Sequence, residues 1–218
     1  MSKKKLLSLS LVVIMIAILS LGSLAWFSDS DEVENEFLIA GSDDQDPDDI
    51  FSVDVFENYD SNGDGTDEEY QEGIIYEDIL PGDKLQKEAF VKNTGYYDQY
   101  VRVIVTISDA TAWLNAVGED INMENVFVGY NADAWTNIEK KIEGETDTVT
   151  YVLYYAGVLK GDEEINLFTG VNIPTSLTQE QAAAFGGDFT IGVKAQAVQT
   201  ENVGANAYEA FQTVGMAY

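Results

Sequence analysis

The feature that most limits the fold of this chain is a series of short segments with the two-residue period of β-strands. Residues 100–107 are rich in β-branched side chains, and residues 50–56 alternate apolar and polar side chains. Turn residues separate the segments, as they do in antiparallel sheets. The predicted strands are residues 50–56, 73–80, 85–93, 100–107, 126–130, 135–142, 148–158, 164–173 and 189–199. The sequence therefore predicts an all-β fold, an antiparallel β-sandwich or jelly roll.

Turn and helix signals add short insertions to this fold. Pro81-Gly82-Asp83 predicts a turn, because proline presets φ and glycine tolerates a positive φ. Thr178 is a candidate N-cap for a helix over residues 178–185. Residues 205–214 are a second helix candidate. We expect both helices to be short additions to the sheets.

The first 25 residues have the layout of a secretory signal peptide. Three lysines at positions 3–5 precede an uncharged apolar run over residues 6–21, and small residues then lead to Ala25. We expect cleavage between Ala25 and Trp26. The alternative is a retained membrane anchor, but this apolar run of 16 residues is short for a bilayer span. The predicted segments are a signal peptide (1–25), an N-terminal arm with an acidic hinge (26–49) and one β-domain (50–218).

The composition excludes several classes of function. The chain has 39 acidic and 11 basic residues. Loss of the three signal lysines leaves eight basic residues, hence a formal net charge of −31. Such a surface repels nucleic acid, because phosphate binding needs lysine and arginine. The chain has no cysteine and no histidine, so it lacks disulfides, the usual zinc ligand and the Ser-His-Asp triad. We expect a protein that is not an enzyme.

An acidic loop over residues 60–68 has the sharpest ligand pattern in the chain. Oxygen ligands alternate along it, and Gly65 at the sixth place permits the sharp turn that lets them converge on one ion. Gln71 takes the place of the usual bidentate glutamate, and no long amphipathic helices flank the loop. A Ca²⁺ site is one interpretation, and an acidic turn between two strands is the other. The candidate ligands are Asp60, Asn62, Asp64, Thr66 and Glu68.

Several motifs, in order along the chain, resemble one family of exported proteins. AWFSD at 25–29, NEF at 35–37 and AG at 40–41 are followed by LPGDKL at 80–85 and VKNTG at 91–95. VKAQAVQ at 193–199 is similar to the family's closing strand. Each motif is common alone. Together they resemble the TasA/CalY (camelysin) family, whose members carry a signal peptide handled by a SipW-type signal peptidase.

This resemblance implies a jelly-roll subunit that forms extracellular fibres in the biofilm matrix, at the surface of a Gram-positive-type bacterium. In the implied fibre, the freed N-terminal segment of one subunit adds a strand to the next, so the main partner is the chain itself, head to tail. Val33, Phe37 and Ile39 have the odd spacing that places them on one face of an extended strand. We expect them to be the donor-strand residues. The alternative is that residues 34–41 form an ordinary first strand of their own domain.

Two further functions stand beside the fibre subunit. One is a monomeric cell-surface binding module, or an accessory protein that anchors fibres and would itself be a partner of the polymer. The other is sugar binding by tyrosines, among them Tyr96-Tyr97, Tyr100, Tyr151 and Tyr154-Tyr155, although half-buried sheets are the commoner place for such residues. Members of the camelysin type have been described as proteases, but this chain has no H-E-x-x-H motif.

Overall fold

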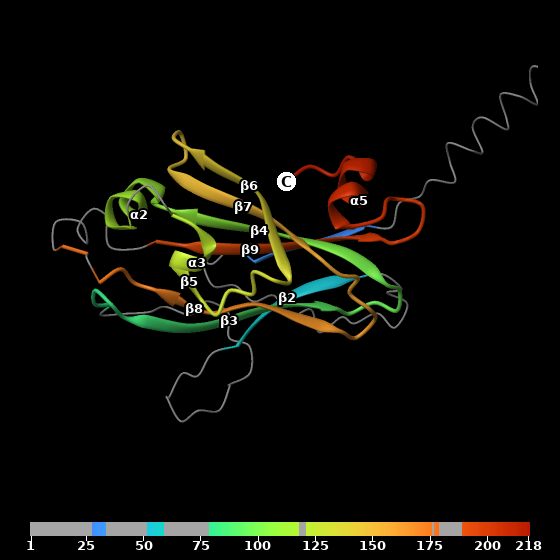
Figure 1. Cartoon of the computed structure of the whole chain (residues 1–218), viewed down its shortest axis with the longest axis horizontal. Coiled ribbons are helices and arrows are strands. Elements are labelled where there is room, and N and C mark those ends of the chain that lie inside the picture. The colour runs from blue at the N-terminus through green and yellow to red at the C-terminus, as the bar shows by residue number, and fades with distance from the viewer. Residues whose placement is uncertain (1–27, 34–51, 59–78, 118–120, 176, 179–188) are drawn as a thin grey trace, which may run out of the picture.

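Two antiparallel sheets pack face to face in the computed structural model, which describes residues 28–33, 52–58, 79–117, 121–175, 177–178 and 189–218 (Figure 1). The five-stranded sheet has the order β1-β9-β4-β7-β6, and the four-stranded sheet has the order β2-β3-β8-β5. The strands are β1 (Ser28–Val33), β2 (Val53–Asn58), β3 (Lys84–Asn93), β4 (Gln99–Ser108), β5 (Phe127–Val128), β6 (Trp135–Glu143), β7 (Thr148–Tyr155), β8 (Glu164–Asn172) and β9 (Ile191–Gln199). The predicted all-β sandwich is confirmed.

The chain crosses repeatedly from one sheet to the other. It passes from β3 to β4, from β4 to β5, from β7 to β8 and from β8 to β9, changing sheets each time. The resulting orders 1-9-4-7 and 3-8-5 are those of a jelly roll, in which the first and last strands lie side by side. This topology places the two ends of the described chain on the same sheet.

Most predicted strands agree with the observed ones within a few residues. The predicted segment 126–130 instead begins inside the short helix α3 (Met123–Val126), and only Phe127–Val128 is extended. The helix predicted over 205–214 is α5 (Ala207–Val214), capped by the side chain of Asn206. Helix α2 (Ala110–Val117) was not predicted. The predicted helix at 178–185 and most of the predicted strand at 73–80 lie outside the described residues.

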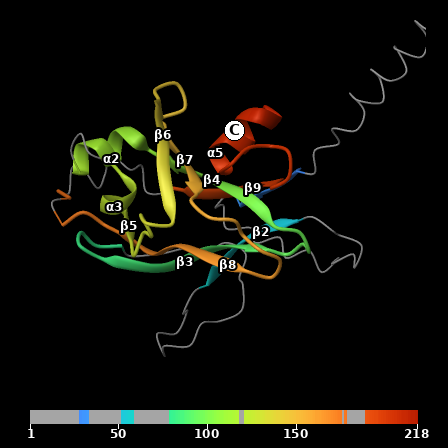
Figure 2. The ribbon, with the colours of Figure 1, turned by 45° about the vertical axis from the view of Figure 1, so that its right-hand side comes forward.

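The central strands β4 and β9 bury both of their faces. Their inward side chains, such as Val103 and Ala195, join the core between the sheets, where Trp113 and Phe168 are also fully buried. Their outward side chains lie beneath α5, which packs Ala210 and Phe211 onto the five-stranded sheet (Figure 2). A second small core therefore covers the outer face of this sheet.

Arg102 of β4 fastens the C-terminal segment to that outer face. Its side chain is almost fully buried, and its guanidinium lies 4.4 Å from the centre of the Phe211 ring. Nε donates to Gln196 Oε1 at 2.7 Å, and Nη2 donates to the carbonyls of Met216 and Ala217. Burial lowers the pKa of Arg102, and the nearby Tyr154 and Glu139 oppose this shift. The last residues of the chain are thus tied to the centre of the sheet.

Candidate strand-exchange edge

Strand β1 forms one edge of the five-stranded sheet and is held there by a single neighbouring strand, β9. The pairing is antiparallel and runs without a break from Ser28 opposite Val198 to Val33 opposite Val193. Because ladder bonds join main-chain atoms, they give affinity for an extended segment in this place, while the side chains that meet the core give specificity. The edge of β9 is therefore a strand-binding site that β1 occupies.

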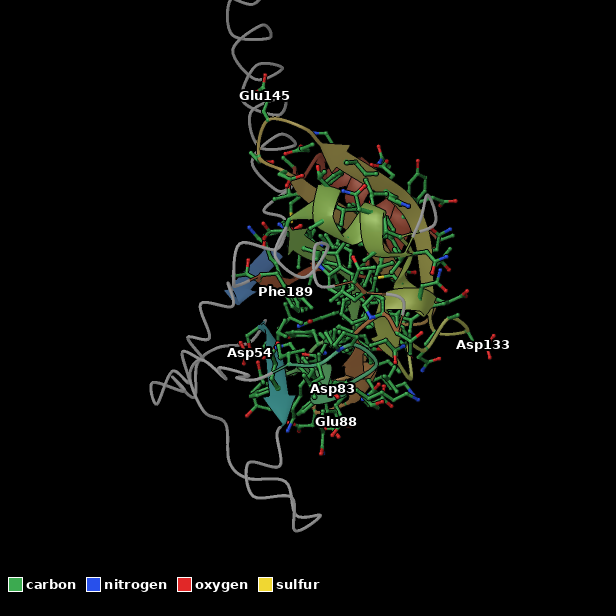
Figure 3. All side chains as sticks on the ribbon, turned by 90° about the vertical axis from the view of Figure 1, so that its left-hand side faces the viewer. Asp54, Asp83, Glu88, Asp133, Glu145 and Phe189 are labelled. Atoms are coloured by element: carbon green, nitrogen blue, oxygen red, sulfur yellow. The ribbon has the colours of Figure 1, made fainter. Side chains whose placement is uncertain are left out.

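The inner side of this edge is lined by small apolar side chains. Val193, Ala195 and Ala197 of β9 are buried members of the main core. Strand β2 lies across the sandwich and contacts both β1 and β9, with Val53 and Val55 turned into the same core. Figure 3 shows β1 and β2 as the outermost strands on one side of the molecule. Strand β1 therefore lies beside β9 in its own sheet and against β2 of the other sheet. We call this position the slot.

Register and connectivity define the direction of β1. Ser28 and Tyr100 both pair with Val198, so β1 starts where the β3–β4 turn lies. We call this the tyrosine end, defined by residues 94–98 and 156–163. Strand β1 finishes beside the start of β9, at the opposite end, which holds the turn at residues 80–83. We call this the proline end, and Figure 3 looks onto it, with Asp83 and Phe189 labelled.

The other edge of this sheet is built differently. Strand β6 has an irregularity in its pairing with β7 between Asn137 and Glu139, and its exposed residues include Lys140 and Lys141. Bulges and lysines are the features that blunt a sheet edge against further pairing. In the four-stranded sheet, the edge strand β5 has only two residues. Among the described strands, β6 and β5 are thus blunted or short edges, whereas β1 and β2 are regular edge strands of six residues each.

Among the predicted site residues, the structure describes only Val33, the last residue of β1, opposite Val193. The predicted cleavage residues Ala25 and Trp26 and the predicted donor residues Phe37 and Ile39 lie outside the described residues. So do the calcium ligands Asp60, Asn62, Asp64, Thr66 and Glu68. Within the part of the chain that the structure describes, no three acidic side chains converge to hold a metal. Nor is any helix in that part long and apolar enough to cross a membrane.

The structure separates the tyrosines that sequence reasoning grouped together. Tyr100, Tyr151 and Tyr154 are buried, whereas Tyr96 and Tyr97 are exposed. Burial raises the pKa of Tyr151, whose hydroxyl donates to the carbonyl of Ile121 at 2.9 Å. These three buried tyrosines are therefore parts of the two cores, whereas Tyr96 and Tyr97 are presented to solvent.

The sequence predicted a donor strand through Val33, Phe37 and Ile39, but not the pairing of residues 28–33 with β9 of the same subunit. The six residues of β1, SDSDEV, show neither alternation nor a β-branched run, so no local signal marks a strand. The sequence of β9 is the indication that was available. It is typical of a central strand, and a central strand has a neighbouring strand on each side, here β1 and β4.

Comparison of this chain with protein-family models, with curated proteins and with solved structures finds no match.

Proposed function

We propose that this protein is a secreted structural subunit that polymerises into extracellular fibres by exchanging its N-terminal strand. The observation that carries the proposal is the position of β1. It is a terminal strand at the sheet edge, paired with β9 alone within its sheet, and separated from β2 by residues 34–52. The motifs that resemble the TasA/CalY family support the same function.

Exchange of β1 needs no new type of contact. A β1 segment from another subunit makes the same ladder with β9 and meets the same inner face of β2. The closed and exchanged forms therefore differ little in enthalpy, and protein concentration decides between them, as in domain swapping. The intramolecular arm has an effective concentration in the millimolar range for short linkers, so closed monomers dominate in dilute solution.

The exchange proceeds in one direction only. Each subunit gives its β1 and receives another at a different surface, which is a heterologous, head-to-tail contact. Such a contact continues without limit unless it closes into a ring. The product is therefore a filament of one protein, with a free arm at one end and an empty slot at the other.

Signal cleavage is the first step in this scheme. A cut after Ala25 leaves only Trp26 and Phe27 ahead of Ser28, the first residue of β1. Before cleavage, the apolar segment 6–21 holds the start of β1 at the membrane. A SipW-type signal peptidase would thus release the strand that is exchanged.

A monomeric surface-binding or fibre-anchoring module is the second candidate. Its support is that β1 closes the sheet of its own domain, so the isolated subunit is complete. In that case the protein would stay monomeric, or would receive a strand from a fibre without giving one.

Electron microscopy and size-exclusion chromatography of the mature protein (26–218) distinguish the two candidates. We expect fibres at high concentration, and only monomers from a chain that lacks residues 26–41. A peptide of residues 26–41 should bind this truncated chain, whereas a scrambled peptide should not. Long fibres from the truncated chain would refute strand exchange, and monomers under all salt and pH conditions would leave the second candidate.

A further inference from the structure

Exposed apolar side chains gather at the two opposite ends of the sandwich. At the tyrosine end, Tyr96 and Tyr97 are 77% and 63% exposed. At the proline end, Leu80 is 64% exposed, and Ile142 in the β6–β7 hairpin is 47% exposed. Among the described residues, the other exposed large apolar side chains belong to the C-terminal segment, Tyr208 and Tyr218. The tyrosine end thus has two neighbouring exposed rings, whereas at the proline end Leu80 precedes β3 of one sheet and Ile142 lies on β6 of the other.

The two tyrosines are held outward by a rigid turn. Asn93 is fully buried, and its Nδ2 donates to the carbonyls of Tyr97 and Leu159, at 2.8 Å and 3.0 Å. Its Oδ1 accepts from the amide of Gly95. Within the described part of the chain, neither tyrosine ring has a stacking partner or a hydrogen bond. Because a buried asparagine already fixes this turn, the turn loses little further conformational freedom when its two aromatic rings bind a partner.

The Leu80 turn is equally well fixed. The amide of Asp83 donates to the carbonyl of Leu80 at 3.1 Å, and the amide of Leu80 donates to Asp83 Oδ2 at 2.7 Å. Gly82 has a φ of +91°, as the third position of a type II turn requires. The amide of Gly82 also donates to the carbonyl of Ile173. This predicted turn is confirmed, and it holds Leu80 in solvent.

Chain connectivity favours one pairing of ends in a fibre. A donated β1 lies antiparallel to the acceptor's β9, so its last residue, Val33, sits toward the acceptor's proline end. In the donor, the body begins at Ser52, whose Oγ is 2.7 Å from Thr94 Oγ1 at the tyrosine end. Residues 34–51, 18 in number, join these two points. A linker between these two points is shortest when the donor's tyrosine end faces the acceptor's proline end, so this arrangement orders the least chain.

Charge is consistent with this arrangement. Of the exposed charged residues at the tyrosine end, Asp98, Asp162 and Glu163 are acidic and Lys160 is basic, whereas at the proline end the exposed Lys84 adjoins the half-buried Asp83. Two tyrosine ends facing each other would bring like charges together, which is destabilising.

We infer that a second copy of this chain docks end to end, with Tyr96 and Tyr97 of one subunit against the Leu80–Asp83 turn of the next. The inference rests on the proposed strand exchange and adds the contact between the folded bodies. The strand supplies main-chain bonds that any subunit pair would make. The apolar contact sets the orientation of successive subunits and the stiffness of the fibre.

Because the chain has no cysteine, introduced thiols test this contact directly. Mature Y97C and L80C proteins are mixed, allowed to form fibres and treated with a maleimide cross-linker of short spacer. We expect covalent dimers from the mixture and a ladder of multimers from the Y97C/L80C double variant. Y208C mixed with L80C is the matched control, since Tyr208 is an exposed tyrosine on α5, which covers the outer face of the five-stranded sheet, and should give no dimers above background.

A double variant, Y96S/Y97S, gives a second readout. Its thermal unfolding should match that of the wild-type monomer, because both side chains are exposed, while the critical concentration for fibre formation should rise about tenfold. Fibres that form without Y97C–L80C cross-links, and with an unchanged critical concentration for Y96S/Y97S, would overturn the end-to-end contact and leave strand exchange standing. If the wild-type protein forms no fibres, both proposals fall.

Discussion

Lys87 and Glu57 form an ion pair inside the sandwich, with Lys87 Nζ 2.5 Å from Glu57 Oε2 and both residues almost fully buried. They lie on the adjacent strands β3 and β2, in phase with the core residues Ala89 and Val55. Burial lowers the pKa of Lys87, and the neighbouring Glu57 carboxylate opposes this shift. A charged pair thus occupies a place that the strand pattern reserves for apolar side chains.

Breaking this ion pair from one side should destabilise the protein strongly. Lys87→Met removes the ammonium group that faces the buried Glu57 carboxylate, at a cost of about 3–5 kcal/mol in the free energy of unfolding. The double variant E57L/K87M removes both charges and should recover most of that loss. Urea unfolding of the two variants measures the difference. A single variant as stable as the wild type would show that the pair is dispensable.

Removal of Arg102 should loosen the C-terminal segment without disturbing the main core. Arg102→Met removes the donor to Gln196 Oε1 and to the carbonyls of Met216 and Ala217, which should cost about 2–3 kcal/mol. Hydrogen exchange should rise in residues 207–218 and stay unchanged in β3 and β8. Lys160→Met, at an exposed position, is the control. Unchanged protection of α5 in Arg102→Met would contradict the role of the guanidinium.

Alkaline pH should destabilise the fold through Tyr130. Burial raises its pKa from 10.0 to about 12, with a smaller contribution from Glu124, and its hydroxyl donates to the carbonyl of Trp135. A folded-state pKa above the unfolded value means that the folded protein binds more protons between these pH values. This stabilising contribution is complete below pH 10 and is lost as the pH rises toward 12. The unfolding free energy of Tyr130→Phe should therefore fall less steeply over that range, and an equal slope would contradict the assignment.

The acidic loop predicts calcium binding that calorimetry can measure. Titration of the mature protein with Ca²⁺ should show saturable binding that Asp60→Ala and Asp64→Ala remove. Asp133→Ala, an exposed acidic residue elsewhere, should bind as the wild type does. Titrations without saturation would favour the plain acidic turn.

Ionic strength should control the rate of fibre formation. A mature chain with a net charge of −31 repels its copies, and salt shortens the screening length from about 30 Å at 0.01 M to about 8 Å at 0.15 M. Light scattering should therefore show faster assembly at higher NaCl. If assembly is equally fast at both concentrations, repulsion between subunits does not limit it.

The elements predicted best are those whose own hydrophobic pattern matches the burial of their side chains. Strand β4, with Val101, Val103 and Val105 turned inward, was placed to within one residue at each end. The helix expected over residues 205–214 is α5, and the structure shows Asn206 capping its start. In both, the local pattern and the final environment agree.

The features that were not predicted depend on contacts with residues far away in the chain. Strand β1 is a strand because β9 offers it an edge, and nothing in SDSDEV indicates that pairing. The Glu57–Lys87 pair escaped for a related reason, since two polar residues 30 positions apart reveal no contact. Helix α2 is held partly by Asp147, which accepts from Thr111, again across a long separation.

The pairing of β1 with β9 also sets an order in time. Each residue of β1 is made 160 to 170 positions before its partner, from Val33 with Val193 to Ser28 with Val198. At 5–20 residues per second, synthesis separates the two strands by roughly 8 to 34 s. During that interval a newly made arm has no sheet of its own to join, while finished neighbours already have theirs. The last strand to appear thus determines how long the first remains available to other molecules.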